Sequence, residues 1–141
     1  MHGWPVAKPN KDLFADNTIL VADITDDHGK EIILSWWPNY GSKAHGGLYA
    51  YNQNGSLVKG YPKYTNLLSF GNNIILDDID EDGYIDLIAY DSNKNIIIAI
   101  DLNKKDDGMS LDWPQLQHDP QHTGCYDCDK KLRTRPQSKL V

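Results

Sequence analysis

Short apolar runs, each bounded by turn-forming residues, recur along most of the chain. They are rich in Ile, Val, Leu and Tyr, with Asn, Asp and Gly between them, which is the pattern of short β-strands. No long stretch repeats its apolar residues about every 3.6 positions, so no helix is expected. The runs form two groups of four, at residues 18–24, 31–37, 47–52 and 56–61 and at residues 73–79, 84–90, 95–102 and 110–115. The sequence therefore predicts an all-β protein with two four-stranded antiparallel units.

The two units repeat one another at a spacing of about 55 residues. Residues 21–27 and 31–34 align with residues 77–82 and 86–88. Aromatic–proline pairs recur with a similar spacing, at Trp4-Pro5, Tyr61-Pro62 and Trp113-Pro114. A turn signal precedes the last run of each unit, at Asn54-Gly55 and Asp107-Gly108. Tandem four-stranded repeats of this kind are typical of β-propeller blades.

The predicted blades cannot form a complete propeller, because two of them do not close a ring. The apolar runs at residues 74–76 and 96–98 suit sheets buried on both faces, and uncovered faces of this kind drive association. We therefore expect a partial propeller that packs against further blades or further copies of itself. The expected division is a segment at 1–15 that supplies the last strand of a preceding blade, blades at 16–64 and 65–124, and a tail at 125–141.

The loop after residue 77 has the spacing of a calcium site. Calcium takes about six to eight oxygen ligands, and alternate residues of a tight loop direct their carboxylates at one point. Gly83, at the sixth loop position, permits the sharp turn. The predicted ligands, at alternate positions from one to nine, are Asp78, Asp80, Asp82, the backbone carbonyl of Tyr84, and Asp86. Four carboxylates repel one another, so a dication would stabilise the loop.

The residues around this loop distinguish it from an EF-hand. An EF-hand has a bidentate acid at position twelve and helices on both sides, whereas this loop has Ala89 there and strand-like flanks. Magnesium suits the site less well, because it favours a rigid octahedral shell and keeps its water. The alternative is an acidic, solvated turn without an ion.

A second, weaker calcium site is predicted at the matching loop of the first unit, with Asp23, Thr25, Asp27 and Glu31 as its ligands. Thr25 replaces an acid there. His28 takes the sixth position, and the glycine comes one residue late. We expect this loop to be a turn held by hydrogen bonds, with calcium binding as the alternative.

The second loop also carries a family resemblance. The motif Asp78-x-Asp80-x-Asp82-Gly83-x-x-Asp86-Leu87, followed by a strand, resembles the FG-GAP or VCBS repeat, the blade unit of integrin-α-like propellers. Residues from about 16 to 124 fit this repeat. Residues 113–124 resemble an ending common in secreted bacterial and archaeal proteins with such propellers. The resemblance implies a calcium-stabilised extracellular scaffold for adhesion or carbohydrate binding, or an accessory domain of a secreted hydrolase, and it implies no reaction.

The distribution of charge along the chain disfavours nucleic acid as a partner. The net charge is −6, and the tail from residue 129 carries five basic residues and one acid. Of the 14 basic and 20 acidic residues, nine and 19 remain in residues 1–128. An acidic body repels phosphate backbones, so we expect no nucleic-acid partner. The chain has no run of about 18 apolar residues, so no membrane span is expected, and residues 1–5 lack the pattern of a signal peptide.

Other polar and aromatic clusters have simpler interpretations. Cys125 and Cys128 favour a local disulfide over a zinc site with the nearby histidines or free thiols. The polar group near the end of the second blade favours backbone hydrogen bonding over acid–base chemistry, because no G-x-S-x-G setting is present; its members are His118, Asp119 and His122. An aromatic group favours packing between blades over sugar stacking; it consists of Trp36, Trp37 and Tyr40, with His45 nearby.

The sequence therefore predicts a calcium-binding, non-catalytic propeller region, extracellular or on the cell surface, that binds a protein or carbohydrate ligand. The alternative is the C-terminal accessory region of a secreted peptidase or glycosidase whose catalytic part lies elsewhere.

Overall fold

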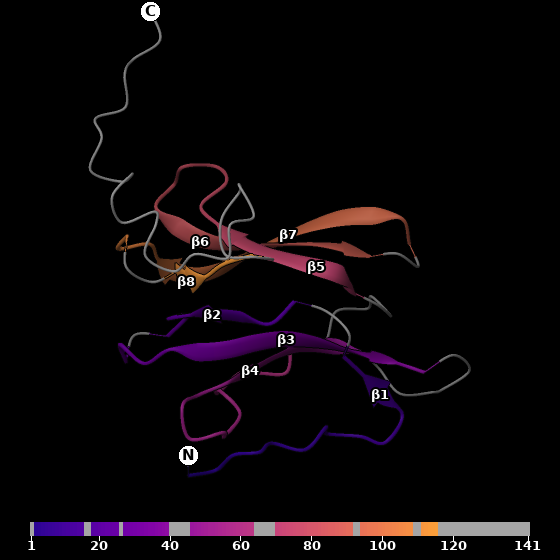
Figure 1. Cartoon of the computed structure of the whole chain (residues 1–141). Helices are drawn as coiled ribbons and strands as arrows, with labels where there is room; N and C mark the ends of the chain where they lie inside the picture. The colour runs from indigo at the N-terminus through magenta and orange to yellow at the C-terminus, as the bar shows by residue number, and fades with distance from the viewer. Residues whose placement is uncertain are drawn as a thin grey trace, which may run out of the picture.

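The fold is all-β, with no helix among the described residues (Figure 1). A computed structural model describes residues 2–15, 18–25, 27–39, 46–63, 70–91, 94–108 and 111–115. The strands are β1 (Leu13–Phe14), β2 (Leu20–Ala22), β3 (Glu31–Pro38), β4 (Gly47–Tyr51), β5 (Phe70–Asp77), β6 (Tyr84–Asp91), β7 (Ile96–Lys105) and β8 (Leu111–Trp113). Within those ranges no helix is long and apolar enough to cross a membrane.

The first sheet is built around β3. Strand β4 pairs with one edge of β3, while β2 and the short β1 pair with successive parts of the other edge, all antiparallel. The expected fourth strand at 56–61 is reduced to one isolated bridge, Tyr51↔Leu57, and a second bridge, Leu48↔Lys63, lies just after it. The chain turns between them, because the Tyr61 N–H donates to the Val58 carbonyl at 3.0 Å. Gly60, with φ +87°, provides the left-handed conformation of this turn.

The second sheet has the order β5-β6-β7, and all its pairs are antiparallel. The strands expected at 73–79, 84–90 and 95–102 are confirmed to within a few residues. In the register, Leu76 lies opposite Leu87 and Asp77 lies opposite Asp86. This hairpin therefore places the ends of both strands at the loop that was predicted to bind calcium.

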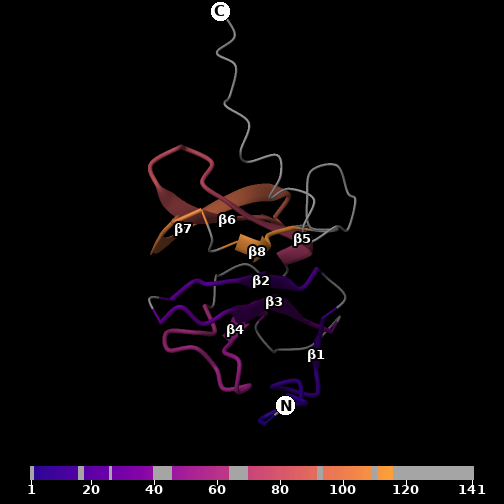
Figure 2. The same ribbon diagram turned by 60° about the vertical axis from the view of Figure 1, so that its left-hand side comes forward.

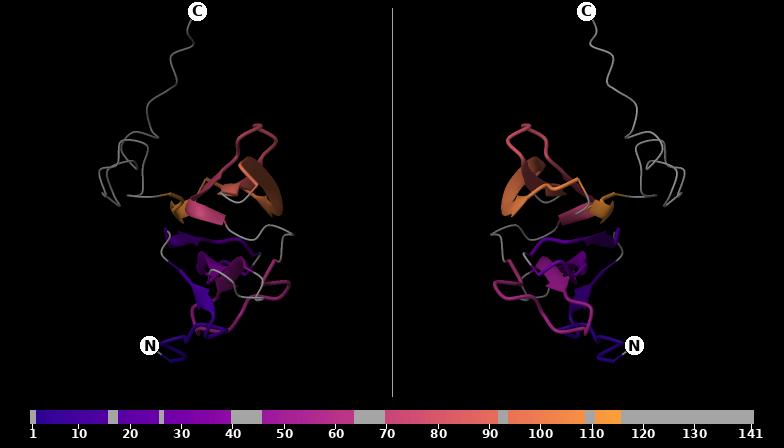
Figure 3. Two further views of the ribbon diagram at one scale, coloured as in Figure 1. Left: turned by 90° about the vertical axis from the view of Figure 1, so that its right-hand side faces the viewer. Right: turned by 90° about the vertical axis from the view of Figure 1, so that its left-hand side faces the viewer.

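The last strand, β8, is in a different sheet from the one predicted. We expected residues 110–115 to complete the second unit, but β8 pairs with β2 through Val21↔Trp113 and Ala22↔Leu111. On its far side, the Leu76 N–H donates to the Pro114 carbonyl at 2.9 Å, and β8 lies beside β5 at the junction of the two sheets (Figures 2 and 3). The buried strand β2 would otherwise expose an unpaired backbone edge, which is costly. Among the described residues, the sheets therefore have five and three strands instead of four each.

The two sheets stack face to face and share one hydrophobic core (Figure 1). Alternate residues of each strand point inward, as a period of two requires. From the first sheet and its turns the core takes Leu20, Ala22, Ile24, Ile33, Leu48 and Ala50, and from the second it takes Ile74, Leu76, Ile85, Leu87 and Ala89. The two sheets therefore pack against each other through one apolar layer.

The outer face of the first sheet is covered by the N-terminal segment. Trp4 and Val6 pack on a small cluster that includes Tyr49 and Tyr51, and the Trp4 indole N–H donates to the Gln53 carbonyl at 2.9 Å. Trp36 packs in the same cluster, while the Trp37 ring contacts Phe14 at a centroid distance of 5.9 Å. These tryptophans therefore pack within the fold, and the segment expected as a strand of a preceding blade lies on the outer face of β3 and β4.

The outer face of the second sheet is more open. Ile75 on β5 is 37% exposed and Ile97 on β7 is 77% exposed. Tyr84 and Tyr90 on β6 are also exposed. This face differs from its counterpart on the first sheet, where aromatic residues of the N-terminal segment lie over the strands.

The shared core yields a paired test of the sheet packing. Ile85 is fully buried between the sheets, so Ile85→Ala should lower the free energy of unfolding by about 2–4 kcal/mol. The same change at the exposed Ile97 should cost about 0.5 kcal/mol or less. Urea denaturation monitored by tryptophan fluorescence measures both values. Equal losses at the two positions would contradict the stacking of the sheets.

Candidate metal centre

The candidate centre is the loop between β5 and β6. The apolar pair Leu76 and Leu87 fixes the hairpin in the core, and the acidic residues follow directly. The chain reverses through two left-handed residues, Glu81 at φ +61° and Gly83 at φ +89°. A glycine suits the second of these because it has no Cβ to clash in that conformation. The loop then closes onto β7, since the Asp106 N–H donates to the Gly83 carbonyl at 2.9 Å.

Three of the predicted ligands come together. One carboxylate oxygen from each of Asp78, Asp80 and Asp86 lies within 4.8 Å of the other two. Asp86 is 8% exposed, and its Oδ2 accepts the Ile79 N–H at 3.2 Å. The two carboxylate oxygens of Asp78 accept the N–H groups of Asp82 and Gly83, at 3.1 and 2.9 Å. These hydrogen bonds hold the carboxylates close despite their mutual repulsion.

The other two predicted ligands lie differently. The Asp82 carboxylate is not part of the group of three, and it accepts the Tyr84 N–H at 2.9 Å. Asp82 contributes its own N–H instead, which lies 3.3 Å from an oxygen of Asp80. Tyr84 begins β6 and its side chain is 42% exposed. The arrangement is thus a group of three carboxylates with Asp82 and Tyr84 at its side.

The donor set decides which ions fit the loop. All three side chains offer hard, anionic oxygen atoms, which calcium and magnesium prefer. The group includes no thiolate or imidazole, the ligands typical of zinc and copper sites. The loop is also open to solvent at Asp80, which would leave room for water ligands. These features fit calcium, with its tolerance of irregular coordination.

The loop between β2 and β3 has the same backbone design. The Glu31 carboxylate accepts the Ile24 N–H at 2.8 Å, as Asp86 does for Ile79. Asp27 accepts the Gly29 N–H at 2.8 Å, as Asp82 does for Tyr84. The two loops therefore share two hydrogen bonds at equivalent positions.

The two loops differ at the sixth position and in their acids. His28, at φ +59°, takes the place of Gly83. The Thr25 hydroxyl donates to Asp27 at 2.9 Å, and the Thr25 N–H donates to Asp23 at 3.2 Å. The Gly29 N–H, and after it the Thr25 hydroxyl, lowers the pKa of the Asp27 carboxyl. The loop is a hydrogen-bonded turn, as expected from its sequence.

Two carboxylates of this turn are buried. Asp23 is 3% exposed and Glu31 is 1% exposed. Burial raises the pKa of Glu31, the neighbouring Asp27 and Asp23 add to the rise, and the Ile24 N–H opposes it. The first loop therefore concentrates negative charge in a less solvated place than the second.

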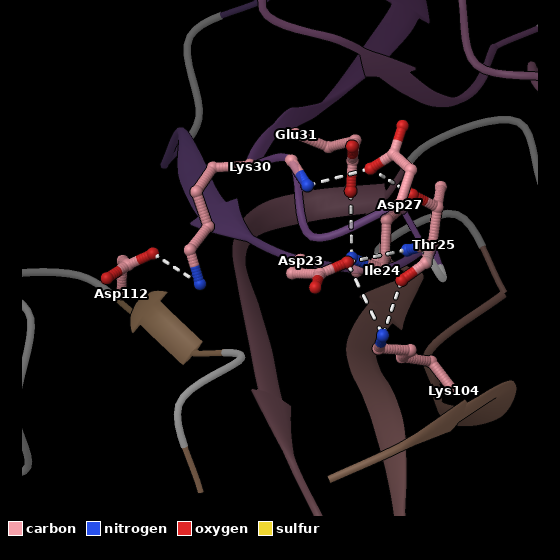
Figure 4. A network of polar contacts seen from close by, with 9 residues as sticks. Asp23, Ile24, Thr25, Asp27, Lys30, Glu31, Lys104 and Asp112 are labelled. Atoms are coloured by element: carbon pink, nitrogen blue, oxygen red, sulfur yellow. Dashed lines mark hydrogen bonds and ion pairs between the residues drawn. The ribbon is translucent and has the colours of Figure 1, made fainter. Parts of the chain in front are cut away.

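A lysine from the other sheet meets this charge. The Lys104 Nζ lies 3.5 Å from the Asp23 Oδ1 and donates a hydrogen bond to the Thr25 carbonyl (Figure 4). Lys104 lies near the end of β7 and is 7% exposed. The sequence interpretation missed it, because 79 residues separate it from Thr25. The sequence feature that could have indicated its burial is the alternation of Ile98, Ile100 and Leu102, which pack on the core and which Lys104 continues.

A second charged contact joins the same loop to β8. The Lys30 Nζ lies 2.9 Å from the Asp112 Oδ2, and both side chains are partly exposed. Figure 4 shows the Lys30 side chain extending from the loop toward Asp112, while the Lys104 side chain reaches the loop from another element. The candidate residues Tyr40, His45, Cys125 and Cys128 lie outside the described residues. The group of His118, Asp119 and His122 lies outside them as well.

Comparisons with known proteins give no family assignment. No protein-family model matches the chain, and neither curated proteins nor solved structures yield a match.

The sixth position of each loop has a left-handed backbone, so opposite substitutions there should have opposite effects on stability. Gly83→Ala should lower the free energy of unfolding by about 1 kcal/mol, because an L-residue disfavours this φ. A Cβ at position 83 would meet nothing within 4 Å, so conformation alone sets the cost. His28→Gly should raise the free energy of unfolding by about 0.5 kcal/mol. Urea denaturation in a chelator measures both changes without a metal contribution.

The control for this pair is His28→Ala, which removes the imidazole and keeps a Cβ at φ +59°. It should stay within about 0.5 kcal/mol of the unmodified protein. A gain in His28→Ala equal to that in His28→Gly would show that the imidazole, and not the backbone conformation, is unfavourable.

Proposed function

We propose that this chain is a calcium-stabilised β-propeller repeat region of the FG-GAP or VCBS type, with a structural and binding role outside the cell. The observation that carries the proposal is the convergence of Asp78, Asp80 and Asp86 within one hairpin loop. The ion would tie the end of β5 to the start of β6, since the three acids come from both sides of the turn. Calcium thereby acts as a structural clip and takes no part in a reaction.

Two features of the fold support the blade interpretation. The sheets pack through one shared core, as neighbouring blades do, and each contains a hairpin loop with the same hydrogen bonds. The β8 strand departs from the simple four-strand unit by pairing with β2. We propose that this exchange closes the pair of blades on itself at the edge where the sheets meet.

The binding role rests on the exposed outer face of the second sheet. Ile75, Ile97 and Tyr90 offer apolar and aromatic area there. The partner is a protein or a carbohydrate, for which exposed aromatic rings provide stacking surfaces. The acidic character of the chain makes nucleic acid an unsuitable partner.

Calcium binding is the direct test. Titration calorimetry of the full chain should show one bound calcium ion, and calcium at about 100 times the dissociation constant should stabilise the fold by about 2.7 kcal/mol. Asp80→Asn removes one charge from the group of three and should abolish or strongly weaken this effect. Magnesium at the same concentration should stabilise the fold much less.

The matched control is Asp12→Asn, which makes the same change at a partly exposed residue far from the loop in sequence. This variant should bind calcium as the unmodified protein does. The proposal fails if the unmodified chain shows neither heat of binding nor a gain in stability with calcium. Equal calcium binding by the Asp80→Asn variant would show that the ion binds elsewhere in the chain.

A further inference from the structure

The first loop already contains a cation, and it is part of the chain. Two groups of this loop contact the Lys104 ammonium: the Asp23 carboxylate at 3.5 Å and the Thr25 carbonyl. The side chains of Lys104 and Asp23 are only 8% and 5% exposed. A buried ammonium is stable in such a place when oxygen atoms surround it, and buried carboxylates need a positive partner in turn.

The loop that this ammonium contacts corresponds to the loop with the candidate metal position. In the repeat, Asp23 matches Asp78, and Glu31 matches Asp86. The match is structural as well, because Glu31 and Asp86 accept equivalent backbone N–H groups. Figure 4 shows the Lys104 side chain reaching up to the loop, with its nitrogen directed at Asp23 and Thr25.

We propose that the Lys104 ammonium is the resident cation of the first loop and that it excludes a divalent metal from this loop. The correspondence with a metal position rests on the calcium function proposed above, whereas the contacts of Lys104 do not. The chain would then bind one calcium ion, at the second loop, although it carries two loops of the same design.

Unlike a free ion, Lys104 is covalently part of the second sheet. It extends from β7 in the second sheet to a loop of the first, so the charge contact ties the two sheets together. The inward residues before it on β7 pack on the shared core. The contact between the sheets, apolar along most of β7, therefore ends in an ion pair near the last residue of this strand.

The test removes the charge of Lys104 and then adds calcium. The background is the Asp78→Asn, Asp80→Asn protein, in which the second loop is disabled; with Lys104 present, it should bind no calcium. Adding Lys104→Met keeps the length of the side chain and removes its charge. In chelator, this change should lower the melting temperature by about 10 °C, because it leaves buried carboxylates without a partner. Calcium should then restore at least half of the loss, with one ion bound.

Two controls separate this effect from general damage to β7. Lys105→Met makes the same change at the next residue, which is exposed, and should neither lower the melting temperature by more than about 2 °C nor create calcium binding. Asp23→Asn combined with Lys104→Met removes both partners. It should recover part of the lost melting temperature in chelator and should not respond to calcium.

The outcomes are decisive in each case. A Lys104→Met protein that melts like its background, or that calcium does not stabilise, overturns the proposal. If Lys104→Met does not fold in chelator, the double variant with Asp23→Asn decides: folding supports the proposal and failure to fold overturns it. Absence of calcium binding by the unmodified chain would refute the function proposed for the second loop, and these melting temperatures would still test Lys104.

Discussion

Both hairpin loops depend on a buried carboxylate at the start of the second strand. Glu31 and Asp86 each accept the N–H of a residue seven positions earlier, which joins the end of one strand to the beginning of the next across the turn. The bond fixes the turn, but it also places a negative charge where water is scarce. Such a charge is stable only with compensation from donors and cations close by. A cation near the turn would therefore stabilise the hairpin.

The surroundings of the two loops offer different sources of positive charge. The first loop faces the second sheet, and the nearby end of β7 supplies the Lys104 ammonium. The second loop is more open, with Asp80 and Asp82 both exposed. Its carboxylates are held by backbone N–H groups and remain accessible to an ion from solution. The same loop design makes a contact between the sheets in the first loop, and we propose that it binds a metal ion in the second.

The sequence was informative about local structure and less so about pairing. Alternating Ile, Val and Leu predicted most strands, because a strand with one buried face must repeat with a period of two. The same pattern does not name the neighbour, so β8 was assigned to β7 although Leu111 lies opposite Ala22 of β2. The fourth strand of the first unit was overestimated because Gly60 bends the chain there. At the candidate metal centre, loop spacing identified Asp78, Asp80 and Asp86, while the rotation of Asp82 toward the Tyr84 N–H was not predictable from spacing.

Lys104 shows why a charged residue within an apolar alternation is informative. Ile98, Ile100 and Leu102 pack on the core, and the next residue in the same phase is a lysine. A lysine at such a position is stable only if acids from another element lie opposite it, since burial of an unpaired ammonium is costly. The alternation of β7 by itself thus implies a buried acidic partner on a neighbouring element. The acidic loop at residues 23–31 supplies that partner, and the inter-sheet core brings the two together.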